Sequence, residues 1–178
     1  MIVDDNYLSA EGIEKNIDWE VLNAEIVHIC YNGTSAIEAM KKEPVDLIIS
    51  DIEMPDLDGI SMSRQALDIN PMVKIILISA YDKFEYARRA LLLGALDYIE
   101  KPLDYAYLIQ KVKNAFALME REQKNLQLLK QSRPLLIEKF FRDITHRSRQ
   151  EASYRLKPYL NYLNLKLDYD FYNVVILE

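Results

Sequence analysis

Short apolar runs alternate with amphipathic segments along the first hundred residues of the chain. The apolar runs predict strands at 1–3, 24–31, 45–50, 73–79 and 96–100. Between them, apolar residues recur at helical spacing, which predicts helices at 7–17, 34–42, 60–68 and 81–93, and then a long helix that Asp104 caps. Five strands that alternate with five helices indicate an α/β fold, a doubly wound five-stranded parallel sheet with helices on both faces.

Polar side chains gather where four of these strands end. Asp4 and Asp5 follow the first strand, Asp51 ends the third, Ser79 ends the fourth and Lys101 ends the fifth. Because the carboxyl ends of parallel strands meet at one edge of the sheet, and ligands bind there, we expect these five side chains to lie together. Taken singly, each has an ordinary explanation, such as a helix cap or a strand end, and only their joint placement indicates a site.

The segment DLIISDIEMPDLDG at 46–59 puts four acidic side chains into eight residues directly after an apolar strand. Carboxylates that are desolvated side by side repel one another unless a cation or a proton offsets the repulsion. A few oxygen ligands of this kind suit Mg²⁺ together with waters and a phosphate. A lysine and a hydroxyl at the same edge are the groups that a phosphoryl group needs once it is attached.

Composition is ordinary for a soluble globular protein, since half of the 178 residues are hydrophobic and 28% are charged. No apolar run approaches the roughly 20 residues that span a bilayer, and no signal peptide opens the chain. We therefore expect a cytoplasmic protein without membrane contacts. The single cysteine, Cys30, excludes an internal disulfide framework and fits a reducing compartment.

Charge is unevenly distributed between the two parts of the chain. Residues 1–120 carry 21 acidic and 11 basic side chains, a net of −10, whereas residues 121–178 carry 7 and 11, a net of +4. The acidic first part would repel the phosphates of a nucleic acid. The mild basic excess of the second part is more typical of a solvated face than of a DNA site.

The last predicted helix continues beyond the α/β domain. Its apolar residues recur at spacings of four and three, with Glu122 breaking the series: Leu108, Val112, Ala115, Met119, Leu126 and Leu129. The first four are expected to pack on the sheet, which leaves a short exposed stripe. A signalling coiled coil and a plain linker helix explain that stripe equally well.

A change of composition at 132–134 predicts a new segment. We expect a helix at 135–144, a second helix that begins at the capping box 148–151 and runs toward residue 163, and a strand at 171–177. Two helices and one strand cannot bury their own faces, so they are interpreted as part of a second, α+β domain. The predicted organisation is a first domain at 1–120, a linker helix at 121–131 and an incomplete domain at 132–178.

Four motifs of the first domain resemble the receiver domain of bacterial two-component response regulators, which has a CheY-like, flavodoxin-like fold. In chain order they are VDD at 3–5, SDIEMPDLDG at 50–59, ILISAYD at 76–82 and DYIEKPL at 97–103. The resemblance covers roughly residues 1–120. It implies a phosphoacceptor that takes a phosphoryl group from a sensor histidine kinase with Mg²⁺. It does not imply an enzyme, beyond self-limited phosphoryl transfer and autodephosphorylation.

The resemblance assigns a role to each residue of the expected site. Asp51 would be the phosphoacceptor. The metal ligands would be Asp5, Asp51 and the backbone carbonyl of Glu53, with Asp4 acting through water. Lys101 would pair with the phosphoryl oxygens.

The same resemblance implies a switch and two tuning positions. Ser79 would hydrogen-bond a phosphoryl oxygen, and Tyr98 would follow it as the switch aromatic. Glu53 and Tyr81 would tune how fast water removes the phosphate. We also predict a cis peptide bond between Lys101 and Pro102, because Lys101 must turn its ammonium toward Asp51 and bonds to proline are the only cheap cis bonds.

The layout of the whole chain resembles YesN-like, AraC-type transcriptional regulators, which carry a helix-turn-helix pair at the far C-terminus. DNA binding would then need a C-terminal domain absent from this chain, and a homodimer through the last receiver helix or its extension is an open possibility. An enzymatic output domain such as a cyclase is an alternative. The strand followed by acidic residues also resembles haloacid-dehalogenase-like phosphatases, but these need an aspartate where Glu53 stands, which makes that alternative weaker.

Overall fold

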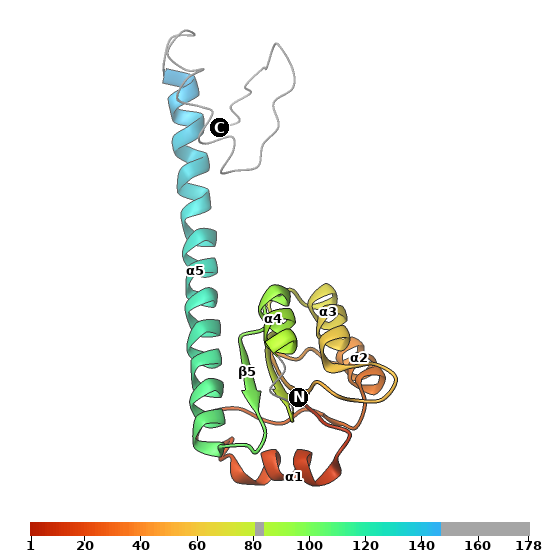
Figure 1. Cartoon of the computed structure of the whole chain (residues 1–178). Coiled ribbons are helices and arrows are strands. Elements are labelled where there is room, and N and C mark those ends of the chain that lie inside the picture. Colours follow the sequence, from red (N-terminus) through yellow and green to blue (C-terminus); the bar gives the residue numbers. More distant parts are fainter. Residues whose placement is uncertain (81–83, 147–178) are drawn as a thin grey trace. The chain divides into compact units, whose positions relative to one another are not determined.

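The computed structural model describes residues 1–80 and 84–146. The chain divides into two compact units, Met1–Met119 and Glu120–Glu178. The first unit is the predicted α/β fold, in which strands and helices alternate along the chain (Figure 1). The five strands that the structure describes belong to one sheet, in the order β2-β1-β3-β4-β5, and every neighbouring pair is parallel.

The carboxyl ends of the strands lie at the predicted positions or one residue from them. Their bounds are β1 Ile2–Val3, β2 Ile29–Cys30, β3 Leu47–Asp51, β4 Lys74–Ser79 and β5 Asp97–Glu100. All five residues of β3 are buried, as expected for a central strand that helices cover on both faces.

Helices cover the two faces of the sheet. Their bounds are α1 Tyr7–Asn16, α2 Gly33–Lys42, α3 Gly59–Ile69, α4 Phe84–Leu93 and α5 Tyr105–His146. Side chains of β3 alternate between two apolar clusters: Ile48 packs with α2, α3 and α4, and Ile49 packs with α1 and the first turns of α5. We call the first of these the α2–α4 cluster. Figure 1 shows the same division, with α1 apart from α2, α3 and α4.

Local capping explains where the helices of the first unit begin. Asn6, Asn32 and Asp58 each accept a backbone N–H with the side chain at the start of α1, α2 and α3. Asp104 accepts the N–H groups of the first turn of α5, as predicted. Gly94 follows the end of α4 with a φ of 88°, the left-handed conformation that favours glycine.

The second strand is shorter than predicted. The apolar pattern predicted a strand over 24–31, but only Ile29 and Cys30 pair with the sheet. Among the described residues they pair with the two-residue strand β1, in which Ile2 pairs with Ile29 and Val3 pairs with Cys30. An apolar run at the edge of a sheet extends no further than the strand with which it pairs.

The predicted interruption of the helix at 132–134 is wrong, because α5 continues through Pro134 to His146. Proline removes one backbone donor and costs about 3 kcal/mol within a helix, which a long run of good helix formers can absorb. Of the predicted apolar stripe, Leu108 and Val112 are fully buried and Leu126 is half exposed. The helix expected at 135–144 therefore forms part of α5.

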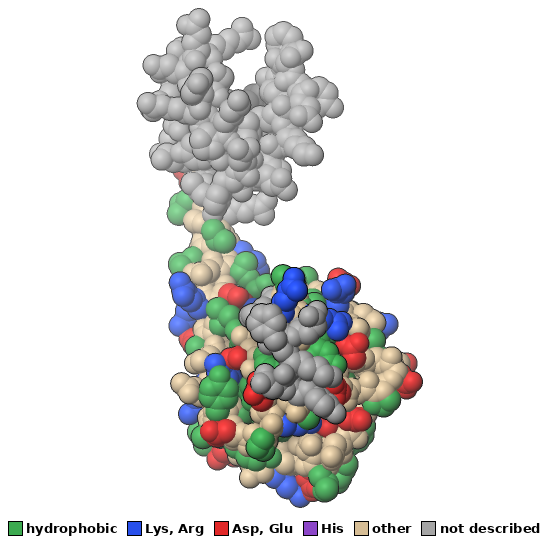
Figure 2. All heavy atoms as spheres, viewed as in Figure 1, with side chains coloured by type: hydrophobic (Ala, Val, Ile, Leu, Met, Phe, Trp, Pro, Cys, Tyr) green, Lys and Arg blue, Asp and Glu red, His purple; other side chains and the backbone are tan. Residues whose placement is uncertain are grey.

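Some predictions lie outside the described residues. These are the helix that begins at 148–151, the strand at 171–177 and the position of Tyr81. Among the residues that are described, no helix is both long and apolar enough to span a membrane. On the visible face, acidic and basic side chains are interspersed with hydrophobic ones (Figure 2).

Candidate functional site

Three strands bring a lysine and two carboxylates together at the carboxyl edge of the sheet. Lys101, directly after β5, places its Nζ 2.7 Å from Oδ1 of Asp51 and 3.0 Å from Oδ2 of Asp4. Asp4 follows β1 and is 1% exposed, and Asp51 ends β3 and is 5% exposed. The expectation that these residues from distant parts of the sequence meet at one edge is thus confirmed in the geometry.

The two oxygens of Asp51 have different surroundings. Oδ2 accepts the backbone N–H of Glu53 at 3.0 Å. Oδ1 is buried and meets Lys101 as an ion pair, without a well-aligned hydrogen-bond donor among the described residues. Asp4 is held from its other side, because its Oδ1 accepts the N–H of Asn6. A buried carboxylate oxygen that lacks an aligned donor is a candidate nucleophile or metal ligand.

Burial and charge act against each other in this cluster. Desolvation raises the pKa of Asp51, and the nearby carboxylate of Asp4 adds to the rise, although Lys101 opposes it. Burial alone would lower the pKa of Lys101, but its two carboxylate partners raise it above the ordinary value. Two carboxylates therefore share one ammonium, and the cluster carries excess negative charge that a further cation would neutralise.

The connection from β3 to α3 holds Asp51 in place by a close backbone approach. The N–H of Ile52 bonds to the carbonyl of Ile78 at 2.8 Å, and the N–H of Gly59 bonds to the carbonyl of Ile52 at 2.8 Å. A Cβ at Gly59 would lie only 2.1 Å from the carbonyl oxygen of Asp51. Glycine is therefore required there, because the first turn of α3 packs directly on the residue that ends β3.

The predicted switch residues lie on neighbouring strands. Ser79 ends β4 and is fully buried, and its backbone carbonyl accepts the N–H of Lys101 at 2.8 Å. Tyr98, on β5, is partly buried and packs against the α2–α4 cluster. The peptide bond between Lys101 and Pro102 is cis, as predicted. The roles of Ser79 and Tyr98 in switching stay predictions.

The predicted metal ligands fit Mg²⁺ by the chemistry of their donors. The chain places Asp4 and Asp51 together in a cluster with excess negative charge, and Asp5 is exposed next to Asp4. Oxygen donors of this kind are those that Mg²⁺ prefers. Within 1–80 and 84–146, no group of three or more His, Cys, Asp or Glu side chains is arranged to hold a metal ion. The predicted set needs only two direct side-chain ligands, completed by a backbone carbonyl and water.

One contact of the site was not predicted from the sequence. The hydroxyl of Tyr86, on α4, donates a hydrogen bond to Oε1 of Glu53 at 3.1 Å. The sequence places Glu53 two residues after Asp51, but no local pattern indicates that a side chain 33 residues later reaches it. Only the packing of α4 beside the β3–α3 connection brings the two together.

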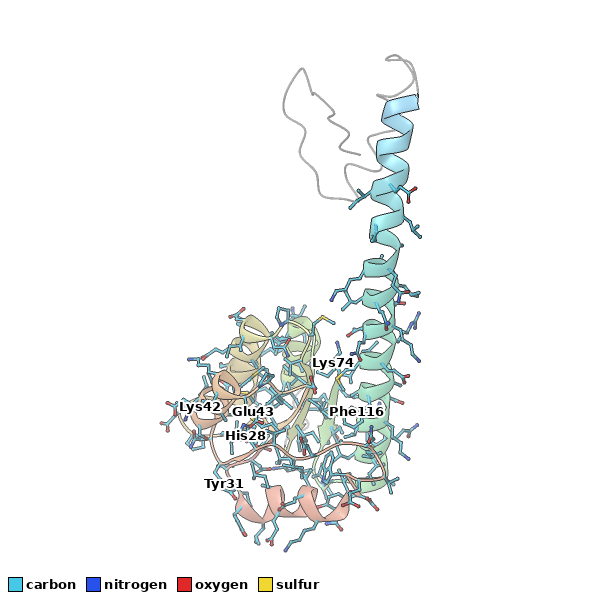
Figure 3. All side chains as sticks on the ribbon, turned by 180° about the vertical axis from the view of Figure 1, so that it is seen from behind. His28, Tyr31, Lys42, Glu43, Lys74 and Phe116 are labelled. Carbon is cyan, nitrogen blue, oxygen red and sulfur yellow. The ribbon has the colours of Figure 1, made fainter. Side chains whose placement is uncertain are left out.

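The histidine that the structure describes in detail lies away from this cluster. His28 directs its Nε2 toward Oε2 of Glu43, 3.3 Å away, where the chain enters β2 and leaves α2 (Figure 3). Cys30, the free cysteine, is buried within the α2–α4 cluster. Neither side chain contributes to the arrangement of Asp4, Asp51 and Lys101.

Comparison with known proteins gives a family match over most of the chain. Residues 1–113 match the family model described as the response regulator receiver domain. A curated relative, the uncharacterized transcriptional regulatory protein YesN of Bacillus subtilis, is 28% identical over 122 residues. The matched segment covers 68% of this chain but 33% of that protein, so the chain spans about a third of its relative's length.

Solved structures agree with the family match. The REC domain of AraT, a response regulator from Geobacillus stearothermophilus, is 35% identical, with a TM-score of 0.65 over 68% of this chain and 95% of that chain. The CheX–CheY–BeF3–Mg complex from Borrelia burgdorferi contains a chain that is 28% identical, with a TM-score of 0.59 over 65% of this chain and 86% of that chain. Both likenesses cover the five-stranded fold described above.

Proposed function

Because this chain belongs to the family of response regulator receiver domains of two-component systems, we propose that Asp51 is its phosphoacceptor. The observation that carries the proposal is the buried Asp51 carboxylate, whose Oδ1 faces the ammonium of Lys101 at 2.7 Å. The donor is a sensor histidine kinase. In the transfer, an oxygen of Asp51 bonds to phosphorus while the bond between phosphorus and the kinase's histidine nitrogen breaks.

Mg²⁺ is the proposed cofactor. A receiver–BeF3–Mg structure among the relatives supports it, as does the excess negative charge of the cluster. Asp5, Asp51 and the backbone carbonyl of Glu53 would hold the ion, with Asp4 acting through a water. When bound, it neutralises the repulsion between the Asp51 carboxylate and the incoming phosphoryl group.

The remaining residues of the site act on the product. Lys101 leaves its ion pairs and holds a phosphoryl oxygen, because the transferred group adds negative charge within its reach. Ser79 donates a hydrogen bond to another phosphoryl oxygen, and Tyr98 moves with Ser79. The added charge thereby changes the surface of the domain near these two residues. The domain is not proposed as an enzyme, since it carries out one phosphoryl transfer on itself and the later loss of that group.

Labelling with a small phosphodonor tests the proposal. Incubation with acetyl phosphate and Mg²⁺ should add one phosphoryl group, seen by intact mass spectrometry. Asp51→Asn should abolish the added mass, because an amide is a poor nucleophile. Asp5→Asn and chelation of the metal should each weaken labelling. Labelling that persists in Asp51→Asn, or that is unchanged when the metal is removed, would refute the proposal.

The Lys101→Ala variant distinguishes phosphorylation of Asp51 from the conformational response to it. The variant should still be labelled, because Asp51 and the metal ligands remain. The response at Ser79 and Tyr98 should be lost, because the phosphate no longer has a partner that draws it toward that edge. Tyr98 fluorescence or its NMR signals before and after labelling would report that response.

We propose transcriptional control as the output of the whole protein. The relative YesN is named a transcriptional regulatory protein, and the present chain covers only a third of it. An AraC-type helix-turn-helix domain beyond this chain would bind DNA, whereas an enzymatic output such as a cyclase is the alternative. The downstream sequence distinguishes the two. The haloacid-dehalogenase-like alternative is not retained, because residues 1–113 match the receiver family.

A second copy of the chain is a further proposed partner, through the receiver part of α5 or its extension. The exposed Leu126, Leu128 and Leu129 on α5 support this. Sedimentation equilibrium should then give a mass near twice the 20.8 kDa of one chain. No membrane partner is proposed, and the expected location is the cytoplasm.

A further inference from the structure

The β3–α3 connection is closed at its base and supported by a contact from outside it. At the base, the N–H of Gly59 bonds to the carbonyl of Ile52 at 2.8 Å. Within the connection, Leu57 is partly buried and packs against the α2–α4 cluster. Glu53 lies between Ile52 and Leu57 in the sequence, and its backbone carbonyl is a proposed ligand of Mg²⁺. The position of this carbonyl therefore depends on the contacts that support the connection.

Gly33 lies in close contact with Leu57. It is the first residue of α2 and is buried. Helices α2 and α3 pack side by side (Figure 1), and the connection that leads into α3 passes the start of α2. A Cβ at Gly33 would lie 2.4 Å from the carbonyl oxygen of Leu57 and 3.1 Å from its Cβ and Cγ. Only glycine allows the start of α2 to come so close to this backbone.

The start of α2 is held firmly, so Leu57 is the partner that a larger residue would displace. Asn32 caps the helix, and its Oδ1 accepts the N–H of Ser35 at 2.7 Å. Ala36, in the first turn, is fully buried in the α2–α4 cluster. By contrast, Asp56 holds a φ of 65°, a left-handed conformation that is unfavourable outside glycine. A connection in such a conformation depends on the contacts around it.

A displacement of Leu57 would be transmitted toward Glu53. The N–H of Leu57 bonds to the carbonyl of Pro55 at 2.8 Å, and the N–H of Met54 bonds to the carbonyl of Ile52 at 3.2 Å. Met54 also packs in the α2–α4 cluster, so this part of the connection lies on the cluster as a unit. Mg²⁺ requires nearly ideal octahedral geometry, with ligands at about 2.0–2.1 Å, and tolerates little misplacement of a ligand.

We propose that Gly33 and Leu57 are positioning residues for the proposed Mg²⁺ site, because their close contact determines where the β3–α3 connection holds the backbone carbonyl of Glu53. This inference rests on the proposed function, in which Mg²⁺ assists phosphoryl transfer to Asp51. The affinity for the metal then depends on a glycine of a neighbouring helix as well as on the carboxylates at the sheet edge.

A Mg²⁺ titration of four proteins tests the inference: the unsubstituted chain, Gly33→Ala, Leu57→Ala and the double variant. Backbone amide NMR signals of residues 51–54 report binding without phosphoryl transfer. Gly33→Ala pushes Leu57 away, and Leu57→Ala removes its apolar contact. Each should raise the Kd for Mg²⁺ by about tenfold, the lower end of the range for residues that orient metal ligands. Because both act on one contact, the double variant should raise the Kd by less than the product of the two effects.

Labelling with acetyl phosphate gives a second measurement that a merely structural role would not change in the same way. Gly33→Ala should need about tenfold more Mg²⁺ for its half-maximal labelling rate. Its maximal rate should stay the same, because Asp51 and the carboxylates beside it are intact. A lower maximal rate with an unchanged half-maximal Mg²⁺ concentration would overturn the inference.

Gly12→Ala is the matched control. It also adds a Cβ to a helical glycine, 2.6 Å from the hydroxyl of Tyr105, but on the other face of the sheet. It should leave the Kd for Mg²⁺ unchanged. An unchanged Kd in Leu57→Ala, which adds no atoms and is informative even if Gly33→Ala does not fold, would overturn the inference, as would independent effects in the double variant. Failure of the proposed metal site looks different, since the unsubstituted chain would then bind no Mg²⁺ and the inference would fall with it.

Discussion

Asp51 is the residue in which the proposed function and stability oppose each other. Its carboxylate is buried beside a second carboxylate, that of Asp4, and the two share the ammonium of Lys101. Burial raises the pKa of Asp51, which means that the ionised form is less favourable in the folded chain than in water. A poorly solvated carboxylate is nevertheless what a phosphoacceptor requires, because its oxygen must be free to bond to phosphorus.

We therefore predict that Asp51→Asn stabilises the metal-free protein. The variant removes a desolvated charge, while Lys101 keeps Asp4 as its partner, so the free energy of unfolding at pH 7 should rise by about 1 kcal/mol. Urea unfolding in the presence of a chelator measures it. Asp68→Asn, which neutralises an exposed carboxylate on α3, is the control and should change stability by less than about 0.5 kcal/mol.

The pH dependence of this difference follows from the raised pKa. The folded state keeps the Asp51 proton to a higher pH than the unfolded state, so the stability of the unsubstituted protein falls as the pH rises from the ordinary value of 3.8 through the folded pKa. Asparagine does not titrate, so the advantage of Asp51→Asn should be greatest near neutral pH and vanish below the ordinary value. An advantage that grows toward acid would contradict the burial argument.

Among the elements, the β3–α3 connection has the tightest backbone requirement. Gly59 lies at the first turn of α3, and a Cβ there would come within 2.1 Å of the Asp51 carbonyl oxygen. Gly94 differs, because its constraint is a φ of 88° with open space around the missing Cβ. The constraint is therefore steric contact at Gly59 and backbone conformation at Gly94.

Alanine substitution at these two glycines should have different consequences. Gly59→Ala must push α3 away from β3, and we expect a loss of more than about 3 kcal/mol of unfolding free energy together with weaker phosphoryl labelling. Gly94→Ala should cost only about 1 kcal/mol, the usual penalty for a left-handed residue, and leave labelling intact. Chemical unfolding and intact mass measure both effects. Equal losses of unfolding free energy at the two positions would show that the close approach of Gly59 to Asp51 does not determine the larger cost.

The elements also show where sequence patterns succeed. Strand ends were predictable because Asp51, Ser79 and Lys101 terminate apolar runs, and parallel pairing alone brings such ends to one edge. The short length of β2 was not predictable, because it depends on how much of β1 is available for pairing. The path of α5 through Pro134 was missed for a related reason, since a local helix-breaking signal was outweighed by the helix formers on both sides.

At the scale of the whole molecule, the sheet gathers groups that are far apart in the sequence into one site. Lys101 and Asp4 are separated by 97 positions, and the contact between Tyr86 and Glu53 also depends on tertiary packing. The sequence predicted that Lys101 and Asp4 lie at the same edge of the sheet, because each directly follows a strand. It could not predict the contact between Tyr86 and Glu53, since a tyrosine within an amphipathic helix looks like any other core residue until the helix is placed.

The excess negative charge of the site leads to a prediction about the stability of the whole first unit. A ligand that binds only the folded state stabilises it by RT ln(1 + [L]/Kd), which is about 1.4 kcal/mol at tenfold excess over Kd. We expect Mg²⁺ to raise the thermal midpoint by a few degrees. Differential scanning fluorimetry with and without chelator measures the shift, and NaCl of equal ionic strength controls for screening. In Asp51→Asn the shift should largely disappear, because the variant removes a proposed ligand and the charge that the metal neutralises. A shift of the same size in Asp51→Asn would place the metal elsewhere on the protein.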